Sequence, residues 1–275
     1  MILVSDLSFQ DFPYGGAEQV NDNIMKEIPG IEFAHSKGLV PDPDNFYIFS
    51  NLIQNLPLMA DGLLLPKLNY IIIEHDYKFC VNRNPYAFSP DGIVPSHEQR
   101  HLAFYANAKA VVCQTPFHKS MFIKNSIAGN IVNFELGWWS EDDLHLLNET
   151  RFCAIGNKDY RYLVYHHDHP WKGTKAASDL CIRNGWDYEI IDNHPDRPDF
   201  LASLASYSTL VFLPQQPETC GRLVVEARCL DMNVITTPTY GASTHPWFKL
   251  SGEILVNKLW DTQGTNKALL LNYLP

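Results

Sequence analysis

The sequence has few basic residues for its length. Its 275 residues include 21 Lys and Arg against 31 Asp and Glu, which gives a formal net charge of −10. Proteins that bind nucleic acid or anionic lipid without specificity concentrate Lys and Arg on their surface. The composition therefore argues against a nucleic-acid partner, and it leaves open only a weak membrane association through a local basic patch.

The sequence also lacks a long apolar run and any C-x-x-C pair. No apolar stretch approaches the ~20 residues that a helix needs to cross a bilayer, and Asp6 follows the first strand too soon for the core of a signal peptide. The six cysteines are widely spaced, and several lie in apolar stretches, where a thiol behaves as a small hydrophobic group. We therefore expect a soluble, cytoplasmic protein with reduced cysteines.

Short apolar runs alternate with stretches of mixed polarity, which indicates parallel sheets covered by helices on both faces. The predicted strands are residues 1–4, 46–49, 70–73, 110–113, 162–165, 188–191, 210–213, 234–236 and 254–256. The predicted helices are residues 17–28, 96–107, 117–126, 171–184, 199–206, 221–230 and 263–273. Ser96 and Thr115-Pro116 are typical of helix starts, and Gly185 is typical of a helix end.

A chain of 275 residues suits two modest domains at the usual ~100–200 residues each. The apolar pattern ends and charge rises within residues 136–144. We therefore predict one domain at 1–138 and a second at 139–275.

Residues 213–228, LPQQPETCGRLVVEAR, are the most informative segment. They follow an apolar strand, which Pro214 and Pro217 must end. Thr219 can cap the helix that comes next, Gly221 has no side chain to keep a ligand from the backbone, and the first-turn amides lack intrahelical partners. Such a helix start attracts phosphate.

Two carboxylates flank that helix start. Glu218 precedes it, and Glu226 lies about two turns along the helix. Each can accept hydrogen bonds from hydroxyls, one pair on a hexose and another on a ribose. The alternative is that Glu218 is a solvated loop residue and Glu226 a surface helix residue. We interpret the segment as a site for a sugar joined to a phosphate.

In this order, Glu218, Gly221, Glu226 and Ala227, followed by residues 233–236 and Gly241, resemble the retaining glycosyltransferases of family four. These enzymes have the GT-B fold and a Glu-x7-Glu signature. The resemblance implies an α/β protein with two Rossmann-like domains that face each other across a cleft. It implies an acceptor side in the first domain and nucleotide-sugar binding in the second.

Two further segments agree with the resemblance. Gly15-Gly16 follows the first strand and resembles the glycine-rich loop that these enzymes place over the donor diphosphate, although paired glycines often mark only a turn. Lys172-Gly173 is similar to the family's phosphate-binding lysine and glycine. A lysine there stabilises the charge that a leaving nucleoside diphosphate gains; the alternative is a solvated first-turn lysine.

The family usually has an arginine shortly before this lysine, and here His166 and His167 stand in its place. A histidine with a pKa of ~6.5 is a weaker cation in the cytosol. Arg222 is the candidate to supply the missing charge. Together with Thr219 and Cys220, it belongs to the predicted donor-binding set.

His75, in the sequence Glu74-His75-Asp76, follows a strongly apolar strand. It resembles the histidine by which related enzymes contact the transferred sugar near the reacting carbon. The alternative is a polar strand end without function. We predict His75, Glu218 and Lys172 as the catalytic residues.

Two patterns invite a metal interpretation. His166, His167, Asp168 and His169 carry ligand atoms, but adjacent loop residues seldom all face one ion. Residues 42–44 form a D-x-D pattern, which is more typical of a solvated turn. We predict no metal site.

The leading hypothesis is a metal-independent, retaining hexosyltransferase that needs no cofactor and uses a UDP- or GDP-linked donor. Its acceptor would be a hydroxyl on a glycan, a lipid or a small molecule. A non-catalytic nucleotide-sugar or glycan-binding protein and a GT-B epimerase are the alternatives.

Overall fold

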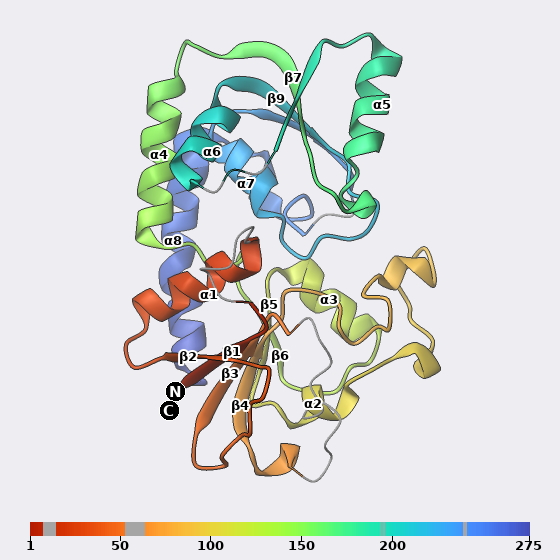
Figure 1. Cartoon of the computed structure of the whole chain (residues 1–275), viewed down its shortest axis with the longest axis vertical. Coiled ribbons are helices and arrows are strands. Elements are labelled where there is room, and N and C mark those ends of the chain that lie inside the picture. Colours follow the sequence, from red (N-terminus) through yellow and green to blue (C-terminus); the bar gives the residue numbers. More distant parts are fainter. Residues whose placement is uncertain (8–14, 53–63, 193, 195, 239–240) are drawn as a thin grey trace. The chain divides into compact units, whose positions relative to one another are not determined.

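The computed structural model describes residues 1–7, 15–52, 64–192, 194, 196–238 and 241–275. The chain divides into two compact units, Met1–Trp138 with Gln263–Pro275, and Trp139–Thr262 (Figure 1). Residues 263–275, which the sequence analysis assigns to the second domain, thus belong to the first unit. Each unit is described by itself.

The first unit contains a parallel sheet in the order β2-β1-β3-β4-β5-β6. Its strands are β1 (Ile2–Ser5), β2 (Glu32–His35), β3 (Phe46–Ser50), β4 (Asn69–Ile73), β5 (Val111–Cys113) and β6 (Ile131–Asn133). The chain moves outward from β1 to β2 and then returns to the other side of β1 at β3. In sheets of this kind, ligands bind beyond the carboxyl ends of the strands at such a reversal.

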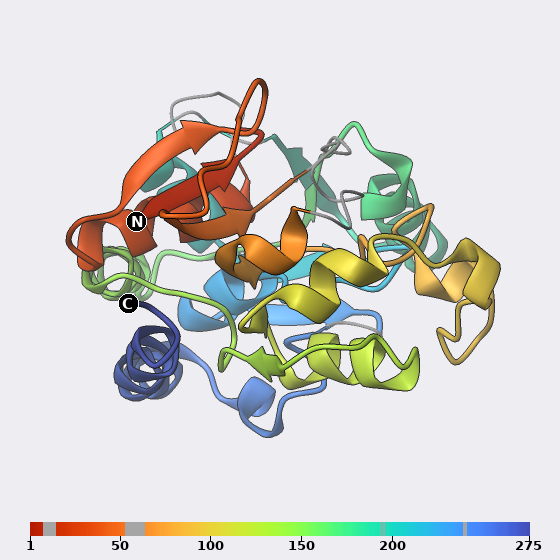
Figure 2. The same cartoon turned by 90° about the horizontal axis from the view of Figure 1, so that it is seen from below.

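Alternate side chains of this sheet enter two separate cores. Tyr47 and Phe49 pack with α2 (Leu102–Asn107) and α3 (Pro116–Lys124), whereas Phe46 and Ile48 pack with α1 (Gly16–Glu27) and with Leu270 of α8 (Gly252–Leu271). Figures 1 and 2 show the helices on opposite faces of the sheet. Both faces are therefore covered, as the apolar strands require.

The second unit contains a smaller parallel sheet in the order β10-β9-β7-β8. Its strands are β7 (Asp159–Tyr165), β8 (Tyr188–Ile191), β9 (Tyr207–Phe212) and β10 (Asn233–Thr236). Its further helices are α4 (Glu141–Ala154), α5 (Thr174–Asn184), α6 (Arg197–Ala205) and α7 (Arg222–Cys229). Here the strand order reverses between β7 and β9.

The helices of the second unit cover its sheet from two sides. On one side, Ala177 and Cys181 of α5 pack on Val164 and Val211. Helices α6 and α7 contact β9, and α4 contacts both of these helices. Short 3₁₀ turns complete the described elements of the chain at Leu65–Lys67, Pro85–Ala87, Ser96–Glu98, Pro170–Lys172 and Pro246–Lys249.

Several element boundaries differ from the sequence predictions. The predicted strand at 254–256 is wrong, because these residues belong to α8. The predicted helix at 96–107 is interrupted, since His101 adopts a left-handed conformation with φ of 57° between Ser96–Glu98 and α2. Strands β2 and β6 and helix α4 were not predicted. The predicted ends at Thr115 and Gly185 are confirmed: Thr115 caps α3 by accepting from the amide of His118, and Gly185 ends α5 with φ of 64°.

A buried carboxylate fixes the segment that follows β4. Glu74 is 2% exposed, and its Oε1 accepts from Lys78 Nζ at 2.5 Å and from the amides of His75 and Asp76 at 3.1 Å each. Its Oε2 accepts from the Tyr105 hydroxyl at 2.7 Å. Removing one partner from a buried ion pair costs about 3–5 kcal/mol. The residues after β4 are therefore held firmly at the edge of the sheet.

A buried histidine supports the same segment. His118 Nε2 lies 2.8 Å from the carbonyl oxygen of Asp76, and its Nδ1 accepts from the amide of Gln114 at 3.1 Å. Nε2 therefore donates, and one neutral tautomer satisfies both bonds. Burial lowers the pKa of His118 to about 3.

The pKa of His118 predicts a pH dependence of stability. The folded value lies below the unfolded value of ~6.5. The contribution of this group is thus fully present above about pH 6.5 and is lost as pH falls toward 3. Its slope approaches about 1.4 kcal/mol per pH unit. Urea unfolding from pH 7 to pH 4 should show a shallower loss of stability in His118→Gln than in the wild type. Equal slopes would contradict the prediction.

A glycine brings the loop after β7 close to the end of β9. Gly173 has φ of 79°, and a Cβ atom there would lie 1.8 Å from the carbonyl oxygen of Leu213. Gly185, at the other end of α5, also has a positive φ, but a Cβ atom there would meet no atom of a described residue within 4 Å beyond its neighbours in the chain. The two positions therefore separate the conformational cost of a side chain from its steric cost.

We expect Gly173→Ala to lower the urea midpoint much more than Gly185→Ala does. In the Gly185→Ala control, the left-handed conformation of alanine lowers the free energy of unfolding by about 1–2 kcal/mol. Gly173→Ala has this cost as well, and it must also displace the chain at the end of β9. Equal losses would show that the contact with Leu213 is unimportant.

Candidate functional site

Lys172 and Glu218 meet at the carboxyl edge of the second unit's sheet. Lys172 follows β7 and Glu218 follows β9, on the two sides of the strand reversal. Lys172 Nζ donates to Glu218 Oε1 at 2.7 Å, and both side chains remain partly exposed. The amide of Gln215 donates to the Trp171 carbonyl at 2.7 Å and ties the two loops together. The structure therefore joins two predicted catalytic residues from distant parts of the sequence.

The start of α7 lies directly beyond Glu218. Gly221 is the N-cap, with φ of 84° and ψ of 65°. The predicted N-cap position of Thr219 is therefore wrong, because the left-handed Gly221 occupies the N-cap. The carbonyl oxygens of Glu218 and Cys220 accept from the amides of Gly241 and Ala242 at 2.9 and 3.0 Å. These two bonds hold the loop that carries Glu218 in place. In the same loop, burial raises the pKa of the Cys220 thiol to about 12, so Cys220 is a neutral thiol.

Glu226 belongs to a cluster of four charges. Its Oε1 lies 2.9 Å from Arg197 and 3.5 Å from Arg222. Asp143 lies 3.2 Å from Arg197 and 2.9 Å from Arg222, whose guanidinium stacks 3.9 Å above the Trp139 ring. Burial by itself lowers the pKa of Arg197, but Glu226 and Asp143 outweigh it and raise the net pKa. The cluster joins α4, α6 and α7 at their buried surfaces.

Because of this cluster, the predicted binding residues Glu226 and Arg222 face other charged side chains. Glu226 is only 3% exposed, and the charge of Arg222 is matched by Asp143 and Glu226. The partners Arg197 and Asp143 were not predicted. Ser140 followed by three acidic residues is a signal for the start of α4, where Ser140 caps the amide of Asp143 at 3.1 Å. No spacing rule, however, predicts its pairing with Arg197.

The histidines that replace the expected arginine have partners within the second unit. His166 Nδ1 is bonded to Asp192. His167 Nδ1 accepts from the amide of His169 at 3.1 Å, and burial, Lys172 and His169 lower the pKa of His167. His167 is therefore neutral at neutral pH and supplies no positive charge.

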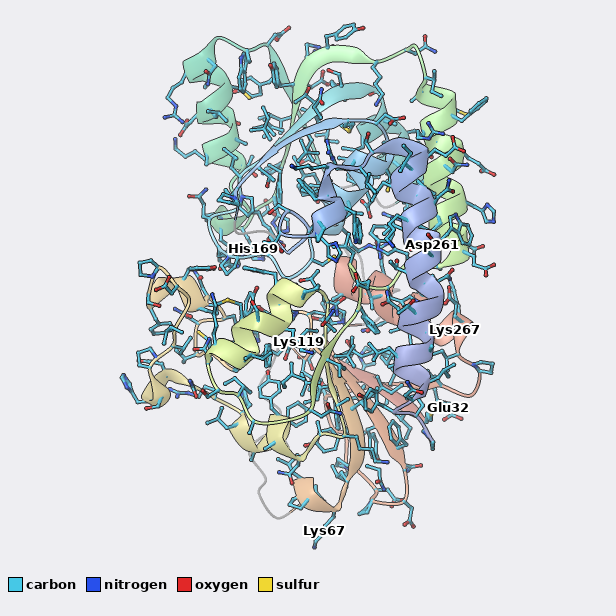
Figure 3. All side chains as sticks on the ribbon, turned by 180° about the vertical axis from the view of Figure 1, so that it is seen from behind. Glu32, Lys67, Lys119, His169, Asp261 and Lys267 are labelled. Atoms are coloured by element: carbon cyan, nitrogen blue, oxygen red, sulfur yellow. The ribbon has the colours of Figure 1, made fainter. Side chains whose placement is uncertain are left out.

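The same loop carries a stack of aromatic rings. The rings of His169 and Trp171 are stacked at 4.4 Å, and His167 stacks on His169 at 5.1 Å. His169 is labelled in Figure 3. No group of three or more His, Cys, Asp or Glu is arranged to hold a metal ion within the described ranges. The imidazoles of this loop thus take part in ring contacts and hydrogen bonds.

In the first unit, the predicted glycine loop meets a carboxylate of its own helix. The amide of Gly15 donates to Glu18 Oε2 at 2.6 Å, and Asn51 donates to Glu18 Oε1. Glu18 is 5% exposed. Its negative charge lies at the start of α1 and satisfies an amide that the sequence analysis assigns to a diphosphate. Gly16 is the first residue of the helix.

His75 lies beyond β4, on the segment that Glu74 holds. Its Nε2 lies 2.9 Å from Ser50 Oγ at the end of β3. Burial, Lys78 and His118 lower the pKa of His75 well below its ordinary value. Asp76 forms an ion pair with Arg83 at 3.3 Å. His75 is thus a neutral imidazole at the carboxyl edge of the first unit's sheet.

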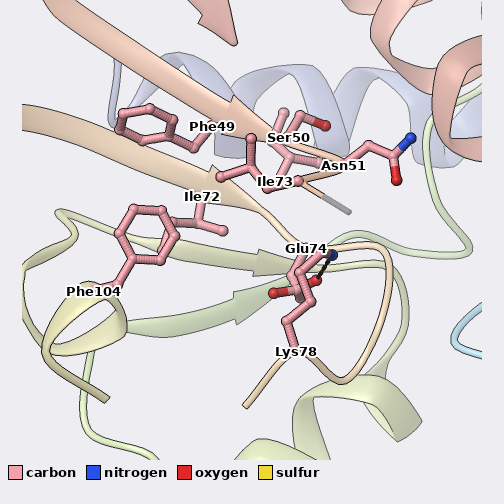
Figure 4. A pocket seen from close by; sticks show the side chains of 9 residues that line it. Phe49, Ser50, Asn51, Ile72, Ile73, Glu74, Lys78 and Phe104 are labelled. Atoms are coloured by element: carbon pink, nitrogen blue, oxygen red, sulfur yellow. Dashed lines mark hydrogen bonds and ion pairs between the residues drawn. The ribbon is translucent and has the colours of Figure 1, made fainter. Parts of the chain in front are cut away.

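A small pocket lies beside this edge. Ser50, Asn51, Glu74 and Lys78 form its polar part, as Figure 4 shows, and its remaining lining is apolar. The wall residues are Phe49, Leu52, Ile72, Ile73 and Phe104. Glu74 and Lys78 satisfy each other there, so the pocket's charges are already paired.

No helix in the described residues has both the length and the apolar character that a membrane crossing requires.

The chain is similar in fold to solved glycosyltransferase structures. Anabaena HepE in complex with UDP matches with a TM-score of 0.53 and 16% identity, over 96% of this chain and 91% of that chain. Escherichia coli trehalose-6-phosphate synthase bound with UDP-2-fluoro glucose matches with a TM-score of 0.53 and 10% identity, over 96% and 91%. A glycosyltransferase from Rickettsia africae matches with a TM-score of 0.50 and 13% identity, over 87% and 80%.

No protein-family model and no curated protein matches the chain. At these identities, the structural matches establish a shared architecture: an α/β protein with parallel sheets, as in GT-B glycosyltransferases.

Proposed function

We propose that the chain is a retaining glycosyltransferase that moves a hexose from a nucleotide-sugar donor to a hydroxyl of a glycan, a lipid or a small molecule. The observation that carries the proposal is the contact of Lys172 with Glu218 at 2.7 Å, at the β7–β9 reversal and beside the start of α7. A cation, a carboxylate and a helix start are the groups that a sugar diphosphate needs.

The ion pair is suited to exchange with such a donor. A diphosphate can take Lys172 from Glu218, and Glu218 is then left to accept hydrogen bonds from sugar hydroxyls. As the glycosidic bond breaks, negative charge grows on the leaving diphosphate, and Lys172 stabilises it. The amides at the start of α7, with Thr219, Cys220 and Gly221, would hold the phosphate oxygens.

The other predicted residues have supporting roles in the proposal. His75 contacts the transferred sugar, and the Gly15-Gly16 loop contacts the diphosphate. Glu226 accepts from the ribose while Arg197 and Arg222 hold it in place. We propose that the reaction needs neither a metal ion nor a cofactor, which is what the family resemblance implies.

A UDP-linked donor is favoured over a GDP-linked one. The HepE structure contains UDP, and the trehalose-6-phosphate synthase structure contains UDP-2-fluoro glucose. The resemblance in sequence and the likeness in fold support the same class of donor, and the cytoplasm is the proposed site of action.

A second candidate is a nucleotide-sugar-binding protein without turnover. It is favoured by the pairing of charges: Lys172 is matched by Glu218, Arg222 by Asp143 and Glu226, and the Gly15 amide by Glu18. Such a protein would bind the donor and release it unchanged.

Donor binding is testable by thermal shift with UDP-glucose, GDP-mannose and UDP. A nucleotide that binds only the folded state adds about 2.7 kcal/mol of stability at 100 times its Kd. We expect the UDP ligands to raise the melting temperature in the presence of EDTA. Turnover of the bound donor then separates the enzyme from the binding protein. No shift with any donor would reject both candidates.

The roles of Lys172 and Glu218 are testable by Lys172→Met and Glu218→Gln. Each should lower transfer at least about 100-fold, the effect of removing one group that stabilises the transition state. Both should cost under about 1 kcal/mol of stability, since the pair is partly exposed.

Lys175→Met is the matched control, because Lys175 and Asp179 form an exposed ion pair of the same 2.7 Å length on α5. It should leave transfer unchanged. Equal activity of the Lys172 variant and this control would refute the proposed role of Lys172.

A further inference from the structure

A chain of three polar side chains reaches from α1 to His75 in the first unit. Asn21 lies on α1, Ser50 ends β3, and His75 follows β4. Ser50 Oγ donates to Asn21 Oδ1 at 2.5 Å and lies 2.9 Å from His75 Nε2. Asn21 and Ser50 are both buried. Three separate elements thus converge on one imidazole.

The proton count fixes the direction of these bonds. A serine hydroxyl has one proton, and Ser50 gives it to Asn21 Oδ1. Ser50 Oγ can then only accept from His75, so His75 carries its proton on Nε2. The neutral imidazole therefore has a single tautomer, with an unprotonated Nδ1.

We propose that Ser50, supported by Asn21, is a positioning residue that fixes the orientation and the tautomer of His75. The proposal rests on the proposed role of His75 at the transferred sugar. A ring whose Nε2 is bonded to Ser50 has one orientation and one hydrogen-bonding character at Nδ1. Preorganised groups of this kind cost no reorientation during the reaction.

The charges around His75 agree with a neutral ring. Lys78 and His118 both disfavour its protonation, and burial disfavours it most. The carboxylate of Glu74 is satisfied by Lys78, by Tyr105 and by two backbone amides, so it does not act as a separate base toward the ring. Among the described side chains, Ser50 is therefore the one that accepts a hydrogen bond from the Nε2–H of His75.

The tautomer is measurable without any donor. In ¹⁵N-histidine spectra, with His75 assigned by its loss in His75→Gln, we expect a protonated Nε2 and an unprotonated Nδ1 from pH 6 to 8. Asn21→Leu removes the acceptor of the Ser50 proton, so the hydroxyl can turn to His75 Nε2 and shift the ring toward the Nδ1-protonated tautomer. Ser50→Ala removes the partner and should give a mixture of both.

Transfer kinetics give the second readout. Ser50→Ala should lower kcat at least about 10-fold with a smaller change in KM, and Ser50→Thr should restore part of the loss because it keeps the hydroxyl. Ser120→Ala is the control, since the Ser120 hydroxyl bonds only to the Phe117 carbonyl of its own helix in the described structure.

The two hypotheses fail separately. If the His75 spectrum is unchanged in both Ser50→Ala and Asn21→Leu, the positioning role is wrong whatever the chain transfers. If the spectrum shifts but no nucleotide sugar is bound or used, the positioning of the ring holds and the proposed function fails. Should Ser50→Ala fail to fold, the Asn21→Leu spectrum alone decides.

Discussion

The common direction of the strands is the constraint on which both candidate regions depend. Each sheet is parallel, so every strand of a unit ends at the same edge. Where the strand order reverses, two loops diverge and leave room between them. Lys172 and Glu218 follow the strands on either side of one reversal, and Ser50 ends β3 at the other. Chemistry-bearing residues therefore gather by topology, although they are far apart in sequence.

Buried carboxylates turn this topology into fixed geometry. An unpaired buried charge costs several kcal/mol, so the elements that supply its partners must assemble around it. Glu74 holds the segment that carries His75, and Glu226 joins α6 to α7 and, through both arginines and Asp143, to α4. The pair of Lys172 and Glu218 differs from these clusters, because both of its side chains remain partly exposed to water. The buried clusters hold the elements together, while the partly exposed pair contributes little to stability.

Local sequence signals predicted most of the strands and helices, and they failed where the signal is not local. Residues 254–256 are as apolar as a strand, but they continue into a long helix whose last turns pack on the first sheet. Strands β2 and β6 are short and only partly buried, so their sequences carry little apolar pattern. The predicted helix at 96–107 is interrupted at His101, which is left-handed although it is neither a glycine nor next to a proline.

The sequence by itself determined the alternation of strands and helices, the end of a strand before Pro214, and the presence of Lys172, Glu218 and His75 after strands, because these depend on periodicity and on residues with special backbone restrictions. Only the tertiary structure decided the partners: Glu218 for Lys172, Asp143 and Arg197 around Glu226, Glu18 for the Gly15 amide, and Ser50 for His75. A side chain's partner depends on which elements become neighbours and on which charges must be satisfied once buried. That is a property of the packed sheets, and no stretch of sequence contains it.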